Sequence, residues 1–168
     1  MRLTRTSLRL TFYRVMSQSI DELSFRRLLD SPAETIFGFW TDPDRLVRWM
    51  GRRAEIEPSL GGLFIVDLTG DDIVFGRVVL IEPPNRLELA WGWGGEREPS
   101  IDPGSSRVAL GLEDGPTATT LRLTHRDVPQ SHMEWQTAFW EHHLPRLELA
   151  ATGEPVPPPS WSPGEPRE

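Results

Sequence analysis

Acid–base chemistry near neutral pH is best served by histidine, and His125 is the strongest candidate in this sequence. It lies on the apolar side of the alternating segment 121–126, so its side chain is predicted to point into the protein, next to the start of a helix. There it can bind a ligand carboxylate or act as an acid or base. The alternative, which we favour, is a structural histidine bonded to a backbone carbonyl or to Glu134.

The other polar residues predict no second site. His132 is expected to be exposed near the start of a helix, Asp67 to be a surface charge, and the adjacent His142 and His143 to face different directions. No histidine pair with a nearby carboxylate has the spacing of a zinc site, and no nucleophile elbow or phosphate loop is present. The glycine-rich WGWGGE leads into a loop rather than a helix, unlike a dinucleotide-binding turn. We therefore expect no metal, no cofactor and a binding protein more than an enzyme.

Large aromatic side chains recur at positions predicted to face one space between a sheet and a late helix. Aromatic residues around a concave surface form a shaped apolar pocket, although they can also simply fill the core. The segment 94–105, with glycines near both ends, is either a lid over such a pocket or an ordinary hairpin tip. The predicted ligand-binding residues are Trp40, Trp49, Phe64, Val66, Leu89, Trp91, Trp93, His125, Trp135 and Phe139.

The element that must position these side chains is a long amphipathic helix, predicted over residues 131–152. Its apolar residues recur at three- and four-residue spacing. Ser131 and Glu134 have the spacing of a capping box, and Gly153 supplies a stop. Pro145 inside the segment predicts a kink or a restart of the helix.

The residues before this helix predict one strand, two short helices and then about six strands. Ser31 and Asp42 are the predicted N-caps of the short helices, each with a proline at the next position. From residue 52 the apolar pattern has a period of two, and short turns between the segments favour antiparallel pairing. This order predicts an α+β fold in which a curved sheet wraps the late helix. The clearest strands are expected at 22–30, 64–68, 73–82, 86–93, 108–112 and 121–126.

The two ends differ from the body of the chain. Residues 1–20 carry four arginines and no acid, and are predicted to be a disordered extension; a true start at Met16, an organelle transit peptide and a surface-binding amphipathic segment are the alternatives. Residues 154–168 are rich in proline and are predicted to be a disordered tail, which leaves 21–153 as the domain.

Charge and composition exclude several partners and compartments. Removing the +4 of the first twenty residues from the net charge of −7 leaves −11, which argues against nucleic-acid binding. No apolar run reaches the length of a membrane span. The absence of cysteine is compatible with the cytoplasm, which is the predicted location.

Four segments in this order resemble the START-like superfamily, also called the polyketide cyclase and birch-allergen type (SRPBCC). Within it, they are most similar to the family of the heat-shock-protein-90 ATPase activator's C-terminal domain. The resemblance covers about residues 22–153 and implies a helix-grip fold, with a curved antiparallel sheet of six or seven strands around the last helix and usually an apolar cavity. Phe139 stands where that family often has glycine, so it can fill part of the cavity. The four segments are SPAETIFGFWTDPDRLVRWMG, GGLFIVDLTG, GRVVLIEPPNRLELAW and TTLRLTHRDV, the last followed by the helix with Trp140.

The resemblance implies three functions, in descending order. The first is a non-enzymatic carrier or sensor of a hydrophobic small molecule held in the cavity. The second is a cyclase- or aromatase-like enzyme that uses His125 and an arginine, such as Arg122 or Arg77, to polarise a bound ketone. The third is a protein-binding module that contacts a chaperone, or a second copy of the chain, through its outer surface and its proline-rich tail.

Overall fold

The computed structural model describes residues 21–94 and 101–158, so the predicted N-terminal extension lies outside the described residues. Its elements follow the predicted order, and the α+β class with a curved antiparallel sheet and a late helix is confirmed. In chain order the elements are β1 (Leu23–Leu29), α2 (Ala33–Thr41), α3 (Pro43–Leu46), β2 (Arg53–Ile56), β3 (Leu63–Asp67), β4 (Ile73–Glu82), β5 (Arg86–Gly94), β6 (Ser106–Asp114), β7 (Thr119–Arg126), the 3₁₀ turn η2 (Gln130–His132) and α4 (Met133–Ala151).

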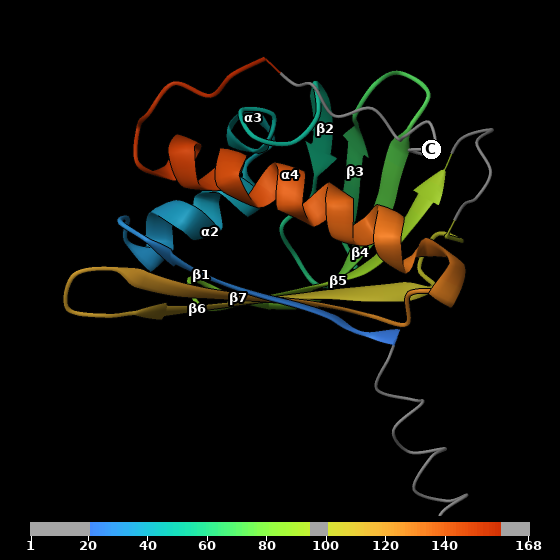
Figure 1. Cartoon of the computed structure of the whole chain (residues 1–168), viewed down its shortest axis with the longest axis horizontal. Coiled ribbons are helices and arrows are strands. Elements are labelled where there is room, and N and C mark those ends of the chain that lie inside the picture. The colour runs from blue at the N-terminus through green and yellow to red at the C-terminus, as the bar shows by residue number, and fades with distance from the viewer. Residues whose placement is uncertain (1–20, 95–100, 159–168) are drawn as a thin grey trace, which may run out of the picture.

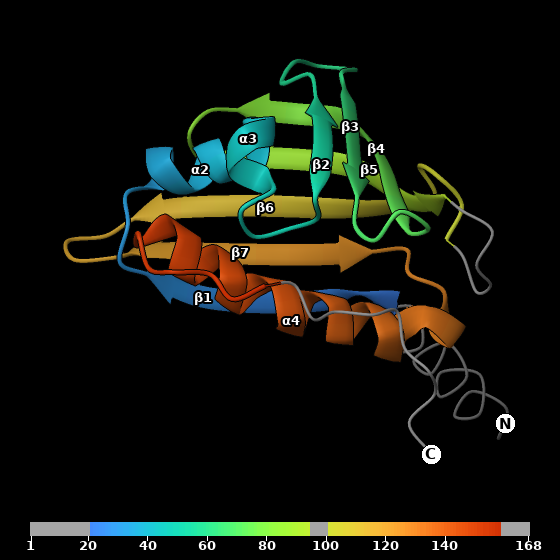
Figure 2. The same ribbon diagram turned by 90° about the horizontal axis from the view of Figure 1, so that it is seen from above.

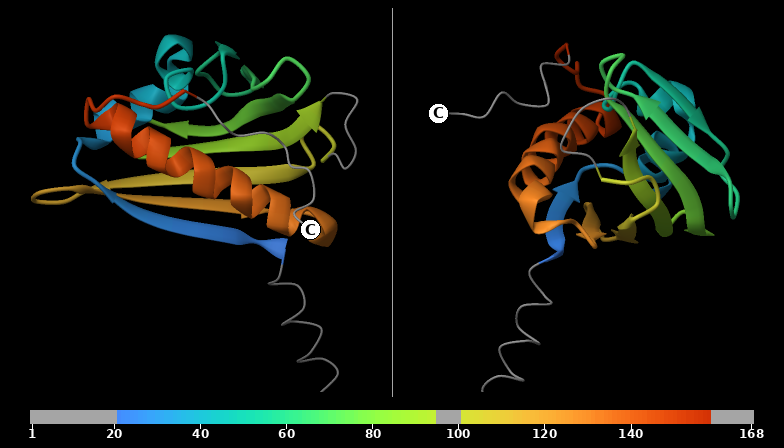
Figure 3. Two further views of the ribbon diagram at one scale, coloured as in Figure 1. Left: turned by 45° about the horizontal axis from the view of Figure 1, so that its top comes forward. Right: turned by 90° about the vertical axis from the view of Figure 1, so that its right-hand side faces the viewer.

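All seven strands form one antiparallel sheet in the order β1-β7-β6-β5-β4-β3-β2. The helix α4 crosses one face of this sheet, while α2 and α3 lie on the same side (Figures 1 and 2). The two views in Figure 3 show the sheet bending around α4, so that the helix lies against its concave face. The right-handed twist of strands produces this kind of curvature.

Alternation along β5 explains how the concave face becomes apolar. Leu87, Leu89, Trp91 and Trp93 are all buried on that face, as their period of two predicts. Gly92 lies between the two tryptophans, and a Cβ atom there would be 2.3 Å from the carbonyl oxygen of Asp102. Only glycine therefore lets the returning chain pass directly over the end of β5.

The N-cap predictions for the two short helices have different outcomes. Asp42 caps α3 as predicted, because its side chain accepts a hydrogen bond of 2.9 Å from the Asp44 amide. The prediction of Ser31 as the cap of α2 is wrong, since the N-cap residue is Pro32. The amide of Ala33 instead donates to Asp114 Oδ1 at 2.9 Å, so a carboxylate from the β6–β7 hairpin supplies the cap.

The start of α4 also differs from its prediction. Ser131 lies in η2, where its hydroxyl bonds the Nδ1 atom of His132 at 2.8 Å, and no side chain caps the helix. The predicted capping box is therefore wrong, because the 3₁₀ turn displaces Ser131 from the N-cap position. The predicted restart at Pro145 is also wrong: the helix runs through this residue, which is exposed, so water can reach the carbonyl that loses its partner.

The end of α4 is fixed by Gly153, which has a positive φ of 79°, as expected for a stop. Beyond it, Val156 packs against the core and the carbonyl of Pro157 accepts a hydrogen bond of 2.6 Å from Arg146. Residues 154–158 of the predicted tail thus lie against the domain, and 159–168 are outside the described residues. No helix in the described ranges is long and apolar enough to cross a membrane.

Candidate functional site

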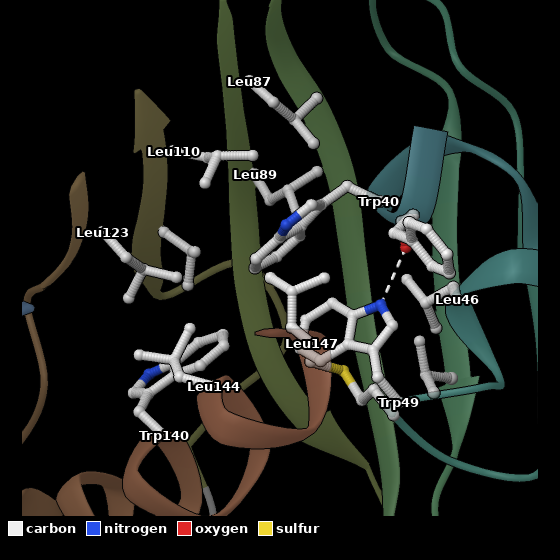
Figure 4. Packing of buried hydrophobic residues seen from close by; sticks show 14 of the residues in the cluster. Trp40, Leu46, Trp49, Leu87, Leu89, Leu110, Leu123, Trp140, Leu144 and Leu147 are labelled. Carbon is white, nitrogen blue, oxygen red and sulfur yellow. Dashed lines mark hydrogen bonds between the residues drawn. The ribbon is translucent and has the colours of Figure 1, made fainter. Parts of the chain in front are cut away.

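The predicted ligand-binding residues meet in one layer between the sheet and α4. Of the ten, nine are buried and Trp135 alone is half-buried. Figure 4 shows one end of this layer, where Trp40 and Trp49 approach α4 and the indole N–H of Trp49 donates to the carbonyl of Phe39 at 2.9 Å. The layer is one continuous core cluster rather than separate patches.

Trp91 is the centre of the layer. Its ring centroid lies 5.3 Å from that of Trp140, 5.9 Å from that of His125 and 6.0 Å from that of Phe139. Phe64 approaches to 6.1 Å from the sheet side. Edge-to-face and tilted contacts of this kind stabilise aromatic clusters beyond their simple burial.

Phe139 lies where the resemblance predicts space. Its ring centroid is 5.1 Å from that of Trp93, 5.0 Å from that of Trp140 and 4.2 Å from that of His143. The phenyl ring therefore lies between β5, which it contacts through Trp93, and its own helix α4. A hollow of about 300 Å³ lies elsewhere, beside residues 30–32 and 114–119, and touches none of the predicted ligand-binding residues.

His125 has both ring nitrogens in hydrogen bonds. The indole N–H of Trp140 donates to Nδ1 at 3.1 Å, and the Nε2 atom lies 2.9 Å from the Ser106 hydroxyl. Because an indole can only donate, Nδ1 must be the acceptor, which assigns the proton to Nε2. Ser106 then accepts from Nε2 and donates onward to the carbonyl of Trp91 at 2.8 Å.

This network leaves neither ring nitrogen of His125 without a partner. Burial lowers the pKa of its imidazole to about 3, so the ring is neutral at physiological pH. It faces inward as predicted, but its partners are Ser106 and Trp140, so the expected backbone carbonyl or Glu134 is wrong. The arginines suggested as its catalytic partners, Arg77 and Arg122, are exposed on the opposite face of the sheet, so the structure does not bring them to His125.

Gln136 is a buried polar residue that the sequence reasoning missed. It is fully buried in the second turn of α4, and its Oε1 atom accepts a hydrogen bond of 3.1 Å from the indole N–H of Trp93. Its Nε2 atom has no hydrogen-bond partner in the part of the chain that the structure describes, and the same holds for Nε1 of Trp91. The available signal was its position, four residues before Trp140 on the apolar face of the helix.

The remaining histidines form no site. His132 is buried, so its predicted exposure is wrong: η2 turns it toward the protein. Burial lowers the pKa of His143 to about 3, and its Nδ1 lies 2.8 Å from the carbonyl of Phe139. Burial and the charge of Arg146 lower the pKa of His142. Within residues 21–94 and 101–158, no group of three or more metal-ligating side chains comes together.

Asp67 is half-buried and pairs with a surface arginine. Its carboxylate lies 3.4 Å from Arg52 and accepts a hydrogen bond from the amide of Gly70. It lies on the outer side of β3, away from the aromatic layer, as its strand parity indicated.

Solved structures with a similar fold include those of three proteins that are 26–36% identical to this chain. DynU16, a protein of the dynemicin biosynthetic locus, is 26% identical with a TM-score of 0.68 over 81% of this chain, and this chain spans 49% of its length. CalU16 from Micromonospora echinospora is 28% identical with a TM-score of 0.63, over 81% of this chain and 77% of that one. The AHSA1-like protein RHE_CH02687 from Rhizobium etli is 36% identical with a TM-score of 0.64, over 88% and 92%.

Family membership follows from the sequence itself. No curated protein matches the chain. A family model does match, and it covers the segment from the end of β1 to the end of α4, which contains the whole aromatic layer. By this match to residues 30–152, the chain belongs to the family of activator of Hsp90 ATPase homolog 1-like proteins.

Proposed function

We propose that this protein binds a hydrophobic small molecule in the aromatic layer between the sheet and α4, as a carrier or sensor rather than as an enzyme. The observation that carries the proposal is the arrangement around Trp91, where indole and phenyl rings from the sheet and from α4 converge on one point. Rigid aromatic walls with few polar atoms are typical of small-molecule sites. The origin of the related DynU16 in a biosynthetic locus also supports a small-molecule ligand.

Entry of a ligand requires side chains to move, because the rings already touch one another. Trp135 is the half-buried ring at the edge of the layer, 4.7 Å from the ring of Trp93, and the ring of Phe139 lies 5.1 Å from that of Trp93. We propose that these two side chains turn aside on binding, while His125 and its hydrogen bonds hold the far wall in place. Rotation of side chains at the mouth of a site is a small and common change on binding.

The test is binding to purified protein. Fatty acids, sterols and aromatic polyketides are titrated by calorimetry and by tryptophan fluorescence, and native mass spectrometry of freshly purified protein looks for a retained adduct. We expect at least one class to bind in the micromolar range and to be weakened by Trp135→Leu. The matched control is Leu60→Ser, since Leu60 is 75% exposed and does not belong to the buried core cluster. No binding by any class and no adduct would overturn the proposal.

A second candidate function is binding to a chaperone of the Hsp90 type. The family match over residues 30–152 favours it, and it requires the outer surface rather than the aromatic layer. A cytoplasmic location, which we also propose, is compatible with both functions.

To test this second function, purified Hsp90 and this protein are mixed, and complex formation and the ATPase rate of Hsp90 are measured. Co-elution or a raised ATPase rate would support this function, and neither effect would reject it. Sedimentation of the protein alone tests the alternative partner, which is a second copy of the chain.

A further inference from the structure

The part of the aromatic layer around Trp93 contains two buried hydrogen-bond donors that lack an acceptor among the described residues. They are Nε2 of Gln136, on α4, and Nε1 of Trp91, on β5, and neither has a partner within the described residues. Both belong to one neighbourhood, because Gln136 bonds the indole of Trp93, and the rings of Trp93 and Trp91 are 6.2 Å apart. Two donors in an apolar layer are therefore left with unused capacity.

The orientation of the Gln136 amide follows from its bond to Trp93. An indole N–H can donate but cannot accept, so the atom facing it at 3.1 Å must be the carbonyl oxygen. The amide nitrogen, which carries two hydrogens, is then the atom that has no hydrogen-bond partner among the described residues. Rotating the amide by 180° would place two donors against each other, so this orientation is not exchangeable.

The two unpaired N–H groups determine which kind of ligand atom can bind to them. A buried donor without an acceptor costs about 1–3 kcal/mol, so an acceptor that reaches it contributes directly to affinity. Because both protein groups are donors, the ligand atom must be an acceptor, and the hydrogen of a hydroxyl or amine cannot pair with them. The nearby imidazoles of His125 and His143 are neutral because burial lowers the pKa of each to about 3, so no positive charge from them favours an anion.

We infer that Gln136 and Trp91 form the polar subsite of the ligand pocket, and that it takes the carbonyl oxygen of a neutral, planar aromatic ketone or quinone. The aromatic walls hold the ring system, and the donors fix its direction. This inference rests on the proposed function, because it assigns the recognition element of the same site. Trp91 and Gln136 are binding residues in this account and take part in no bond-making step.

The test compares two neutral compounds that differ only in the acceptor. These are 9-fluorenone and fluorene, which share one fused ring system, titrated against the full chain by calorimetry. One hydrogen bond of about 1.4 kcal/mol corresponds to a tenfold preference, so we expect fluorenone to bind about tenfold more tightly. In Gln136→Met, which keeps the length of the side chain and removes its donor, that preference is expected to fall to about twofold or less, with fluorene binding little changed.

The matched control is Trp40→Phe. Trp40 is another buried indole whose Nε1 lacks a partner among the described residues, but its ring lies at the other end of the layer, 4.9 Å from that of Trp49. The variants Trp40→Phe and Trp91→Phe lose the same atoms. Only Trp91→Phe, however, is expected to reduce the preference for fluorenone over fluorene. As a second readout, the side-chain amide of Gln136 in ¹⁵N spectra shifts with fluorenone and not with fluorene.

Each outcome separates this inference from the proposed function. Equal affinities for the two compounds, or a preference that survives Gln136→Met, would overturn the subsite while leaving the pocket intact. Binding of another ligand class without either compound would show that the assigned class is wrong. If no hydrophobic compound binds at all, both the proposed function and the subsite are rejected.

Discussion

Two polar residues are buried in the same aromatic layer, and they differ in how much of their hydrogen-bonding capacity is used. At His125, Trp140 and Ser106 satisfy both ring nitrogens, and the chain of bonds ends on the carbonyl of Trp91. At Gln136, one atom is bonded to Trp93 and the other has no partner among the described residues. Burial of a polar side chain therefore does not by itself show how much of its hydrogen-bonding capacity is used.

The largest expected effect comes from the ring that separates these two regions. Phe139→Ala removes a fully buried phenyl group and leaves a cavity, so we expect the free energy of unfolding to fall by about 3–5 kcal/mol. Urea denaturation measures it, with Leu28→Ala as control because Leu28 is 58% exposed. A loss below about 1 kcal/mol would mean that the layer closes around the gap, and that it is less rigid than the ring contacts indicate.

Acidification should affect the His125 region strongly. The pKa of both His125 and His143 is lowered to about 3, so the folded state keeps these rings neutral while the unfolded state protonates them below pH 6.5. Stability is therefore complete above that pH and falls as the pH drops toward 3. At pH 5 the loss is about 2 kcal/mol for each ring.

Denaturation at pH 7.5 and pH 5 measures this loss, and the variant His125→Asn separates the two rings. The drop between the two pH values should shrink by about 2 kcal/mol in the variant. An unchanged drop would show that His125 is not held neutral, which would remove the main contrast with Gln136.

Ser106→Ala breaks the closed network at one point. The Nε2 hydrogen of His125 and the carbonyl of Trp91 each lose their partner, so we expect a loss of about 1–3 kcal/mol in unfolding free energy. Ser24→Ala, at an exposed serine on β1, is the control and should change stability by less than about 0.5 kcal/mol. Equal effects in the two variants would contradict the network.

Gln136→Met should have the smallest effect on stability. It removes an unsatisfied donor as well as the acceptor of Trp93, so the two changes oppose each other and the net shift is expected within about 1 kcal/mol. The midpoint of urea denaturation measures it. A large destabilisation would mean that the amide is structural, as the imidazole of His125 is, and the distinction between the two residues would disappear.

Much of the fold was predictable because periodicity reports which side of an element is buried. The alternation in β5 and the spacing in α4 placed Trp91, Trp93 and Phe139 on facing surfaces before any coordinates. Gln136 has the same helical spacing as these apolar residues, but a search for apolar residues does not detect a polar side chain on that face. Its unused donor follows only from where Trp93 lies, which is a tertiary fact.

Other details could not be read from local sequence for the same reason. The 3₁₀ turn before α4 moved Ser131 out of its capping position, and no local signal predicts that turn. The partners of His125 come from β6 and from α4, at residues 19 and 15 positions away. Strand parity gave the direction of the imidazole but not the groups that it meets.

The cap of α2 has a consequence for how the chain folds as it is made. The Ala33 amide is satisfied by Asp114, a residue 81 positions later, so a nascent chain leaving the ribosome exposes this helix long before its cap exists. We expect the amide of Ala33 to gain protection from hydrogen exchange only when the last hairpin has closed. In Asp114→Ala, which removes the acceptor, the Ala33 amide should lose this protection while the rest of the fold keeps its own, and unchanged protection would contradict this order of events.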